Sequence, residues 1–223
     1  SERRNSLSSV RLVTTALIFS FSRGTALAFY LAVLLIGIFR RDKVVITFLL
    51  ALLIMSPFIM PKNIKGWAKE VNYNPVIFML NADRISIYRN TLNMIRHHPV
   101  IGVGVNTFSK NYFYYKLPEA IGAESGDSVY AHNSYLHMTG EIGFLGLAIF
   151  IWLLFRLFKQ AVITYRSLKD GYYKIISLST IACLIAFLIN GLTETNLYYA
   201  RVAMIFWYMI GFSLCLSKFA NAD

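Results

Sequence analysis

The chain has 223 residues, of which 57% are hydrophobic and 15% aromatic, and its formal net charge is +11. This hydrophobic share leaves too little polar surface to coat a soluble core, so the composition indicates an integral membrane protein. The basic residues lie mostly in short segments between apolar runs, and no basic stripe is long enough to follow nucleic-acid phosphates, so a nucleic-acid partner is excluded. Cys183 and Cys215 lie inside apolar runs, which is typical of small buried side chains and not of a metal cluster or a disulfide framework.

Residues 1–61 are predicted to form transmembrane helices. The first apolar stretch, residues 12–39, is interrupted at Ser22-Arg23-Gly24 and has basic residues at both ends. One helix of this length would leave one basic end on the outer side, so we predict two short helices that meet at an outer Ser-Arg-Gly turn. The alternative is a single tilted span with Arg23 buried in it. The next span runs outward over residues 44–60 and ends at prolines.

Residues 62–131 are predicted to form a long loop domain on the outer side, because the segment is too long for a plain connector. Within this loop, residues 83–98 show apolar side chains at helical spacing and are predicted to form a helix that Pro99 ends. Gly102-Val103-Gly104 lacks the third glycine and the preceding strand of a dinucleotide site, so we predict a turn. The aromatic segment Phe108–Tyr115 is interpreted as an interfacial belt, with sugar stacking as the alternative.

Residues 132–223 are predicted to return to the membrane as three spans, at 142–158, 175–192 and 202–216, with a short outer loop at 193–201. This topology places twelve of the 22 Lys and Arg residues, but only four of the 11 acidic residues, on the cytoplasmic side. The predicted fold class is therefore all-α, a polytopic membrane helix bundle with a long, partly helical periplasmic loop.

His132 is the first candidate for chemistry, because it lies where the polar loop meets the membrane. Imidazole titrates near neutral pH, so His132 could act as a general base. A structural hydrogen-bonding role and a metal-ligand role are the alternatives, and no other His or Cys forms a ligand pattern with it. Asn133 could orient the imidazole ring, and Glu141 could do so if the chain folds back.

Arginines on the outer side are the second group of candidates. Arg84 starts the loop helix, where its guanidinium and the helix N-terminal amides could bind a phosphate, the alternative being a solvated charge. Arg23 and Arg201 lie beside apolar runs, where an arginine is costly and usually functional unless it snorkels to the interface. Arg89 lies on another side of the loop helix and is expected to face solvent or headgroups. Outer arginines near a membrane-borne anion would fit a lipid-linked diphosphate.

Three blocks of the sequence, in this order and spacing, resemble the O-antigen ligase and O-antigen polymerase superfamily of bacterial inner-membrane proteins. They are Ser20-Phe21-Ser22-Arg23-Gly24-Thr25-Ala26, then residues 82–88 (ADRISIY) leading into 98–108 (HPVIGVGVNTF), and then 131–136 (AHNSYL) with 140–146 (GEIGFLG). The resemblance covers nearly the whole chain and concerns the C-terminal half of such proteins. Members usually have ten or more spans and about six are predicted here, so we expect that an N-terminal half is missing.

The resemblance implies an all-helical glycosyltransferase of the C type in the bacterial inner membrane, with its active site facing the periplasm. The implied donor is a glycan on undecaprenyl diphosphate, and no metal or other cofactor is needed. A ligase passes the glycan to lipid A–core oligosaccharide, and a polymerase passes it to another lipid-linked repeat. Arg23 and Arg84 match the family's essential arginines and would hold the diphosphate, with Arg201 as a weaker candidate. His132 matches the ligase histidine and would activate the acceptor for an inverting displacement.

Within this resemblance, the Ala131-His132-Asn133 block is more similar to the ligase, while the O-antigen polymerase and the protein O-oligosaccharyltransferase remain alternatives. A transporter or lipid flippase is the alternative from another class, and it predicts polar residues in the middle of its spans. Here the three C-terminal spans are nearly all apolar and the polar groups gather at one face. That pattern favours an enzyme that works at the membrane interface, among membrane lipids.

Overall fold

The computed structural model describes residues 22–47, 49–51, 66, 69, 82–118 and 129–220. These residues contain helices and no strand, which confirms the all-α prediction for the described part of the chain. The predicted helix before Ser22 and the end of the 44–60 span lie outside the described residues. The elements in chain order are α2 (Arg23–Arg40), α6 (Ala82–His97), α7 (Phe108–Tyr112), η1 (Phe113–Tyr115), α8 (Ser134–Ser167), α9 (Tyr172–Asn190), η2 (Asn196–Tyr198) and α10 (Ala200–Ala220).

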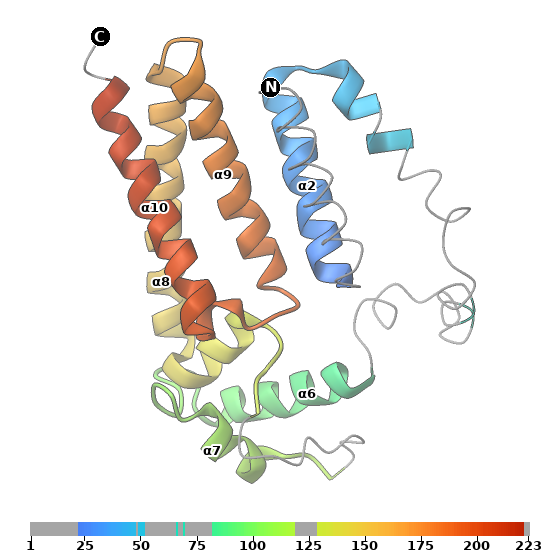
Figure 1. Ribbon diagram of the computed structural model, residues 1–223. Coiled ribbons are helices and arrows are strands. Elements are labelled where there is room, and N and C mark those ends of the chain that lie inside the picture. Colours follow the sequence, from blue (N-terminus) through green and yellow to red (C-terminus); the bar gives the residue numbers. More distant parts are fainter. Residues whose placement is uncertain are drawn as a thin grey trace.

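Four helices form a bundle, and a smaller layer lies across one end of it. Figure 1 shows α2, α8, α9 and α10 running alongside one another, with α6 and α7 crossing beneath them. We call this the α6 end, and we call the opposite end, where α8 turns into α9, the turn end. Among the described residues, the three helices α8, α9 and α10 are long and apolar enough to cross a membrane, and α2 is a shorter apolar helix. The bundle therefore has membrane dimensions, with a polar layer on one end.

The Ser-Arg-Gly block begins a helix. Ser22 is the N-cap of α2, and its hydroxyl oxygen accepts a hydrogen bond from the Thr25 backbone N–H at 3.3 Å. A serine in this role satisfies one of the amides that the first turn leaves without an intrahelical partner. At the other end of α2, Arg41 adopts a left-handed conformation with φ of 53°, and Asp42 caps the helical segment that follows. The predicted break in the apolar run is thus a helix start at Arg23.

Helix α8 is longer than predicted at both ends. We expected a span at 142–158, but the helix begins at Ser134 and continues through the basic segment to Ser167. Asn133 starts it early, because its side chain accepts hydrogen bonds from the next two free amides. Basic side chains on an exposed helix face do not end a helix. The charged residues after position 155 therefore did not mark the C-terminal end of α8. The predicted spans 175–192 and 202–216 correspond to α9 and α10 with shifted ends.

The long loop is attached to α8 by backbone hydrogen bonds at a kink. Gly143 interrupts the helix with φ of 67°, and Phe144 N–H donates to the Pro99 carbonyl at 2.8 Å. The Val103 and Gly104 amides donate to the carbonyls of Gly140 and Glu141, both at 2.9 Å. A Cβ on Gly143 would overlap the Val100 backbone, so only glycine allows this approach. The predicted turn at residues 102–104 is confirmed, and its role is to hold the loop on α8.

The loop helix and part of the aromatic segment form a small core at the α6 end. The predicted helix 83–98 is confirmed as α6, one residue earlier at each end. Phe108 and Tyr112 are buried against Ile87 and Met94 of α6. The interpretation of the whole 108–115 segment as an interfacial belt is therefore wrong for these two rings, which fill a core, although Tyr114 is exposed. This core positions α6 beneath the bundle.

Candidate active site

The side chain of Arg84 reaches from α6 into the loop between α9 and α10, residues 191–199. Its Nη2 lies 2.7 Å from Glu194 Oε1, and its Nη1 donates to the Thr193 carbonyl at 2.6 Å. A guanidinium that bonds both a carboxylate and a backbone carbonyl is fixed in direction as well as in position. Arg84 is therefore held at the junction of the loop helix with the membrane bundle, in an orientation set by the α9–α10 loop.

His132 lies on the other side of the same carboxylate. Its Nδ1 is 3.9 Å from Glu194 Oε2, and its side chain is 28% exposed. The residue has a left-handed backbone with φ of 45°, which is uncommon for a residue with a Cβ and is often found at functional sites. The hydroxyl of Tyr88, one turn after Arg84, donates to the His132 carbonyl at 2.9 Å and helps to hold this turn. The imidazole is thus placed within reach of both the protein's charged groups and solvent.

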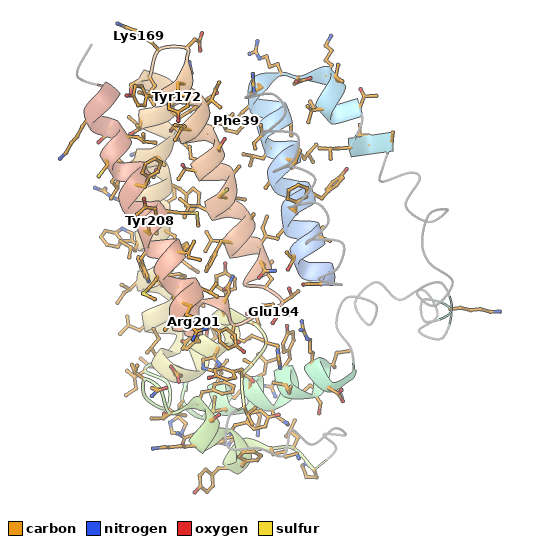
Figure 2. The ribbon with its side chains drawn as sticks, in the orientation of Figure 1. Phe39, Lys169, Tyr172, Glu194, Arg201 and Tyr208 are labelled. Carbon is orange, nitrogen blue, oxygen red and sulfur yellow. The ribbon has the colours of Figure 1, made fainter. Side chains whose placement is uncertain are left out.

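Glu194 carries a negative charge between Arg84 and His132. The His132 ring, whose Nδ1 lies 3.9 Å from the carboxylate, together with the hydrogen bond and charge of Arg84, lowers the pKa of Glu194 below its ordinary value of 4.5, although partial burial opposes the shift. The carboxylate is therefore ionised at neutral pH. Figure 2 shows Glu194 just beyond the end of α9, at the α6 end of the bundle.

The start of α2 meets the same loop. A Cβ on Gly24 would overlap the Thr193 hydroxyl, so the first turn of α2 lies directly against the residue whose carbonyl receives Arg84. Asn190, the last residue of α9, donates to the Thr25 hydroxyl at 3.0 Å and holds the two helix ends together. The structure thus brings the backbone of Arg23, with the helix N-terminal amides, next to the α9–α10 loop that holds Arg84.

The other predicted site residues lie around this centre in different ways. Asn133 accepts from the Tyr135 and Leu136 amides at 2.9 and 3.0 Å and donates to the Leu192 carbonyl at 3.0 Å. These bonds make Asn133 the residue that ties the His132 turn to the α9–α10 loop. Arg201 is exposed in the first turn of α10, at the same end of the bundle as Glu194 (Figure 2).

Two of the predicted candidates point elsewhere. Arg89 is exposed on α6, as its position on the helix predicted. Glu141 is buried, with its Oε1 accepting from the Phe108 amide at 3.1 Å. Its carboxylate lies 3.6 Å from Nε2 of His137, whose ring stacks on Phe108. Glu141 therefore lies beside His137 rather than beside the ring that it was expected to orient, and it secures the loop on α8.

Glu194 is the functional candidate that sequence reasoning missed. It belongs to no recognisable motif, and it was assigned only to a short outer loop. One feature of the sequence could have indicated Glu194. It is the single acidic residue of the 193–201 segment, which is predicted to lie on the same side of the membrane as the candidate arginines. A buried or half-buried arginine needs a counter-charge, and the nearest acidic loop residue was a reasonable place to look.

The chemistry available at this site is anion binding and proton transfer. Arg84 and the N-terminus of α2 present positive charge, while His132 presents a titratable ring beside a carboxylate. Within the described part of the chain, no group of three or more His, Cys, Asp or Glu side chains could hold a metal ion. The groups that are present therefore suit a reaction with an anionic leaving group and a hydroxyl nucleophile.

Comparison with known proteins identifies the family of the chain. No curated protein matches the chain by sequence at a significant level. A protein-family model described as O-antigen ligase matches residues 9–151, well over half of the chain, and the match contains Arg23, Arg84 and His132. It ends before the loop that contributes Glu194. With its three membrane-length helices and this match, the chain is a multi-pass membrane protein that belongs to the O-antigen ligase family.

Proposed function

We propose that this protein is a glycosyltransferase that passes a glycan from undecaprenyl diphosphate to lipid A–core oligosaccharide on the periplasmic face of the bacterial inner membrane. The observation that carries the proposal is the meeting of Arg84, His132 and Glu194 at one end of a membrane-sized bundle, beside the start of α2. Both substrates are amphipathic, with a lipid part in the bilayer and sugars outside it. A site at the bundle end can reach both sugars without drawing them into the membrane.

The donor diphosphate would bind between Arg84 and the first turn of α2. Guanidinium groups and helix N-terminal amides are both good phosphate partners, and Arg23 opens that helix. Glu194 supplies the counter-charge of Arg84 at 2.7 Å. When the bond to the sugar breaks, the diphosphate gains negative charge, and fixed cations stabilise this charge most in the transition state.

His132 would serve as the general base. The acceptor hydroxyl oxygen attacks the anomeric carbon, the bond from that carbon to the phosphate oxygen breaks, and the electron pair leaves with undecaprenyl diphosphate. The hydroxyl proton passes to the His132 ring, which becomes an imidazolium. Glu194, 3.9 Å from Nδ1, stabilises that cation and orients the ring. Attack opposite the leaving group inverts the anomeric centre, and no metal takes part in this scheme.

The direct test measures transfer by the purified full-length protein. Wild type, His132→Ala and Arg84→Ala would each receive undecaprenyl-diphosphate glycan and lipid A–core, with the products separated on a gel. We expect transfer to the core by wild type and a loss of about a hundredfold or more in each variant, because a general base and a charge-stabilising group each contribute at least this much.

Two exposed residues of α6 provide matched controls. Arg96→Ala and His97→Ala remove the same side-chain types from the last turn of α6, far along the helix from Arg84, and should leave transfer unchanged. Full activity of His132→Ala would disprove the general-base role. Longer lipid-linked chains without core product would identify a polymerase, glycosylated protein a protein transferase, and glycan translocation without transfer a flippase.

A further inference from the structure

The turn end of the bundle contains a cavity that the proposed reaction does not use. It has a volume of about 750 Å³ and lies between the end of α2 and the turn that joins α8 to α9. Its lining includes Phe39, Arg40 and Arg41 from the α2 end, with Tyr165 and Lys174 from the facing helices. Figure 2 shows Phe39 at this end, near Lys169 and Tyr172 of the turn, and far from Glu194. The cavity is therefore a separate site at the opposite end of the molecule.

Positive charge dominates the lining. Three of the lining side chains are cations, at positions 40, 41 and 174, and one is an acid, Asp170. The Lys174 ammonium lies 2.9 Å from the Asp170 carboxylate, but that carboxylate is 97% exposed, so solvent screens it strongly. The two arginines come from one helix end and the lysine from another, so the cations approach the cavity from two sides. A cavity with this charge balance favours an anion.

The rest of the lining is apolar or aromatic. Phe39 packs edge-on against Tyr165 with ring centroids 5.8 Å apart, and the Lys174 ammonium lies over the Tyr165 ring at 5.6 Å. Ile175 and Leu178 of α9 continue the lining along a helix of membrane length. The cavity therefore combines cations with an apolar wall that runs into the membrane-spanning region. A small soluble anion would use only the cations, whereas a phospholipid would use both.

We propose that this cavity binds the phosphate headgroup of an anionic membrane phospholipid. Basic pockets between transmembrane helices at the cytoplasmic side are suited to such headgroups, because the phosphate pairs with arginine while the acyl chains stay in the bilayer. The lipid phosphate contacts Arg40 and Arg41 of α2 and Lys174 of α9, and so links α2 to the α8–α9 pair. Bound lipid therefore stabilises the packing of α2 on the bundle, whatever reaction takes place at the other end.

The experiment measures thermal unfolding of the purified full-length protein in a neutral detergent. Three additions are compared at increasing concentration: cardiolipin, zwitterionic phosphatidylcholine and inorganic phosphate. A ligand that binds only the folded protein raises the unfolding temperature in proportion to its binding. We expect cardiolipin to raise the unfolding temperature by several degrees in a saturable manner, and the other two additions to have little effect.

The double variant Arg40→Gln, Lys174→Gln tests the residues. Removing two cations should raise the half-saturating cardiolipin concentration about thirtyfold. The matched control, Arg166→Gln with Lys218→Gln, removes two exposed cations near the same end that do not line the cavity, and it should respond as wild type does. An unchanged cardiolipin response in the double variant, or an equal response to inorganic phosphate, would overturn the proposal. Because the readout is unfolding and not transfer, its failure would leave the proposed reaction unaffected.

Discussion

Glu194 is the residue on which the chemistry of the α6 end depends most closely. One oxygen of its carboxylate pairs with Arg84 and the other faces His132, at 2.7 and 3.9 Å. A single charge therefore serves two partners with different roles, an anion-binding group and a proton acceptor. Its removal would take away the ion-pair partner of the guanidinium and also weaken the stabilisation of a protonated ring, and these two effects can be measured separately.

The first prediction concerns the rate. Glu194→Gln keeps the shape of the side chain but removes its charge, and we expect kcat to fall about tenfold or more because the imidazolium formed during transfer loses its anion. A neutral neighbour also disfavours protonation of the base, so the acidic limb of the pH–rate profile should move to lower pH. Transfer assays across a pH series measure both effects.

A matched carboxylate provides the control for this prediction. Asp83→Asn removes an exposed acid from the first turn of α6, beside Arg84 in sequence, and should change neither kcat nor the position of the acidic limb. If Glu194→Gln lowered kcat without shifting the acidic limb of the pH–rate profile, the role of the carboxylate would be limited to supporting the fold of the loop.

The second prediction concerns stability and pH. The pKa of Glu194 is lowered in the folded protein by the neighbouring His132 ring and by Arg84. Folding therefore favours the ionised form, and the resulting stabilisation is complete above the ordinary value of 4.5 and lost as the pH falls through the lower, folded-state pKa. The difference in unfolding temperature between wild type and Glu194→Gln should thus be largest near neutral pH and shrink below about pH 4.5. A difference that stays constant down to acidic pH would contradict this linkage.

At the scale of elements, the site depends on how closely helix ends approach one another. The start of α2 is held by Asn190 at the end of α9, and the His132 turn is held by Asn133 bonding to Leu192. The 191–199 loop thus contacts three segments that are far apart in sequence, which are the start of α2, the His132 turn and, through Arg84, α6. The contact of Gly24 with Thr193 leaves no room for an added side-chain atom, so a small substitution at this helix end should disturb the site without touching its charged groups.

The third prediction uses the glycine of the Ser-Arg-Gly block. Gly24→Ala would place a Cβ against the Thr193 hydroxyl, and we expect a loss of about 1–3 kcal/mol in the free energy of unfolding, as for overpacking elsewhere. The double variant Gly24→Ala, Thr193→Ala removes the overlapping hydroxyl and should recover part of the loss. Thermal unfolding and transfer assays measure the two consequences.

Gly211 is the matched control for Gly24. A Cβ there meets nothing within 4 Å, and the residue lies inside α10, so Gly211→Ala should be neutral or slightly stabilising because alanine favours a helix. Equal losses in Gly24→Ala and Gly211→Ala would show that the contact with Thr193 has no energetic importance.

At the scale of the whole molecule, the two ends of the bundle carry different groups. The turn end bears the basic residues that follow α2 and α8, and the α6 end bears Arg84, His132 and Glu194. Basic residues near short loops are retained in the cytoplasm. This asymmetry predicts the orientation that we propose, with the candidate active site on the outer side and the proposed lipid-binding cavity on the cytoplasmic side.

The fourth prediction tests that orientation. In a variant with Cys183 and Cys215 replaced by alanine, a cysteine in place of Arg201 should react in intact cells with a maleimide that reaches the periplasm but does not cross the inner membrane. A cysteine in place of Lys169, at the other end of the bundle, should react only after the inner membrane is opened. Labelling of both positions in intact cells, or of Lys169→Cys alone, would contradict the proposed orientation.

The sequence by itself determined the features that depend on near neighbours. Apolar runs of membrane length, the helix start at Ser22-Arg23, the loop helix that ends before Pro99 and the turn at residues 102–104 all follow from residues within a few positions of one another. The boundaries of α8 were missed because Asn133 and Gly143 control them, and charged residues that the helix tolerates were taken as its end. Helical periodicity reports on one face of one element, and it carries no information about which element covers that face.

The tertiary structure decided which polar groups meet. Arg84 and Glu194 lie 110 positions apart, and nothing local to either residue marks them as partners. Likewise, only the fold distinguishes His132, which is 28% exposed, from His137, which is buried between aromatic rings five residues later, although each ring lies near a carboxylate. The cavity that joins Arg40 and Lys174 also depends on how α2 packs against α9. An ion pair or a cavity forms where packing brings distant segments together, so its members could be predicted only once the helices had been placed in space.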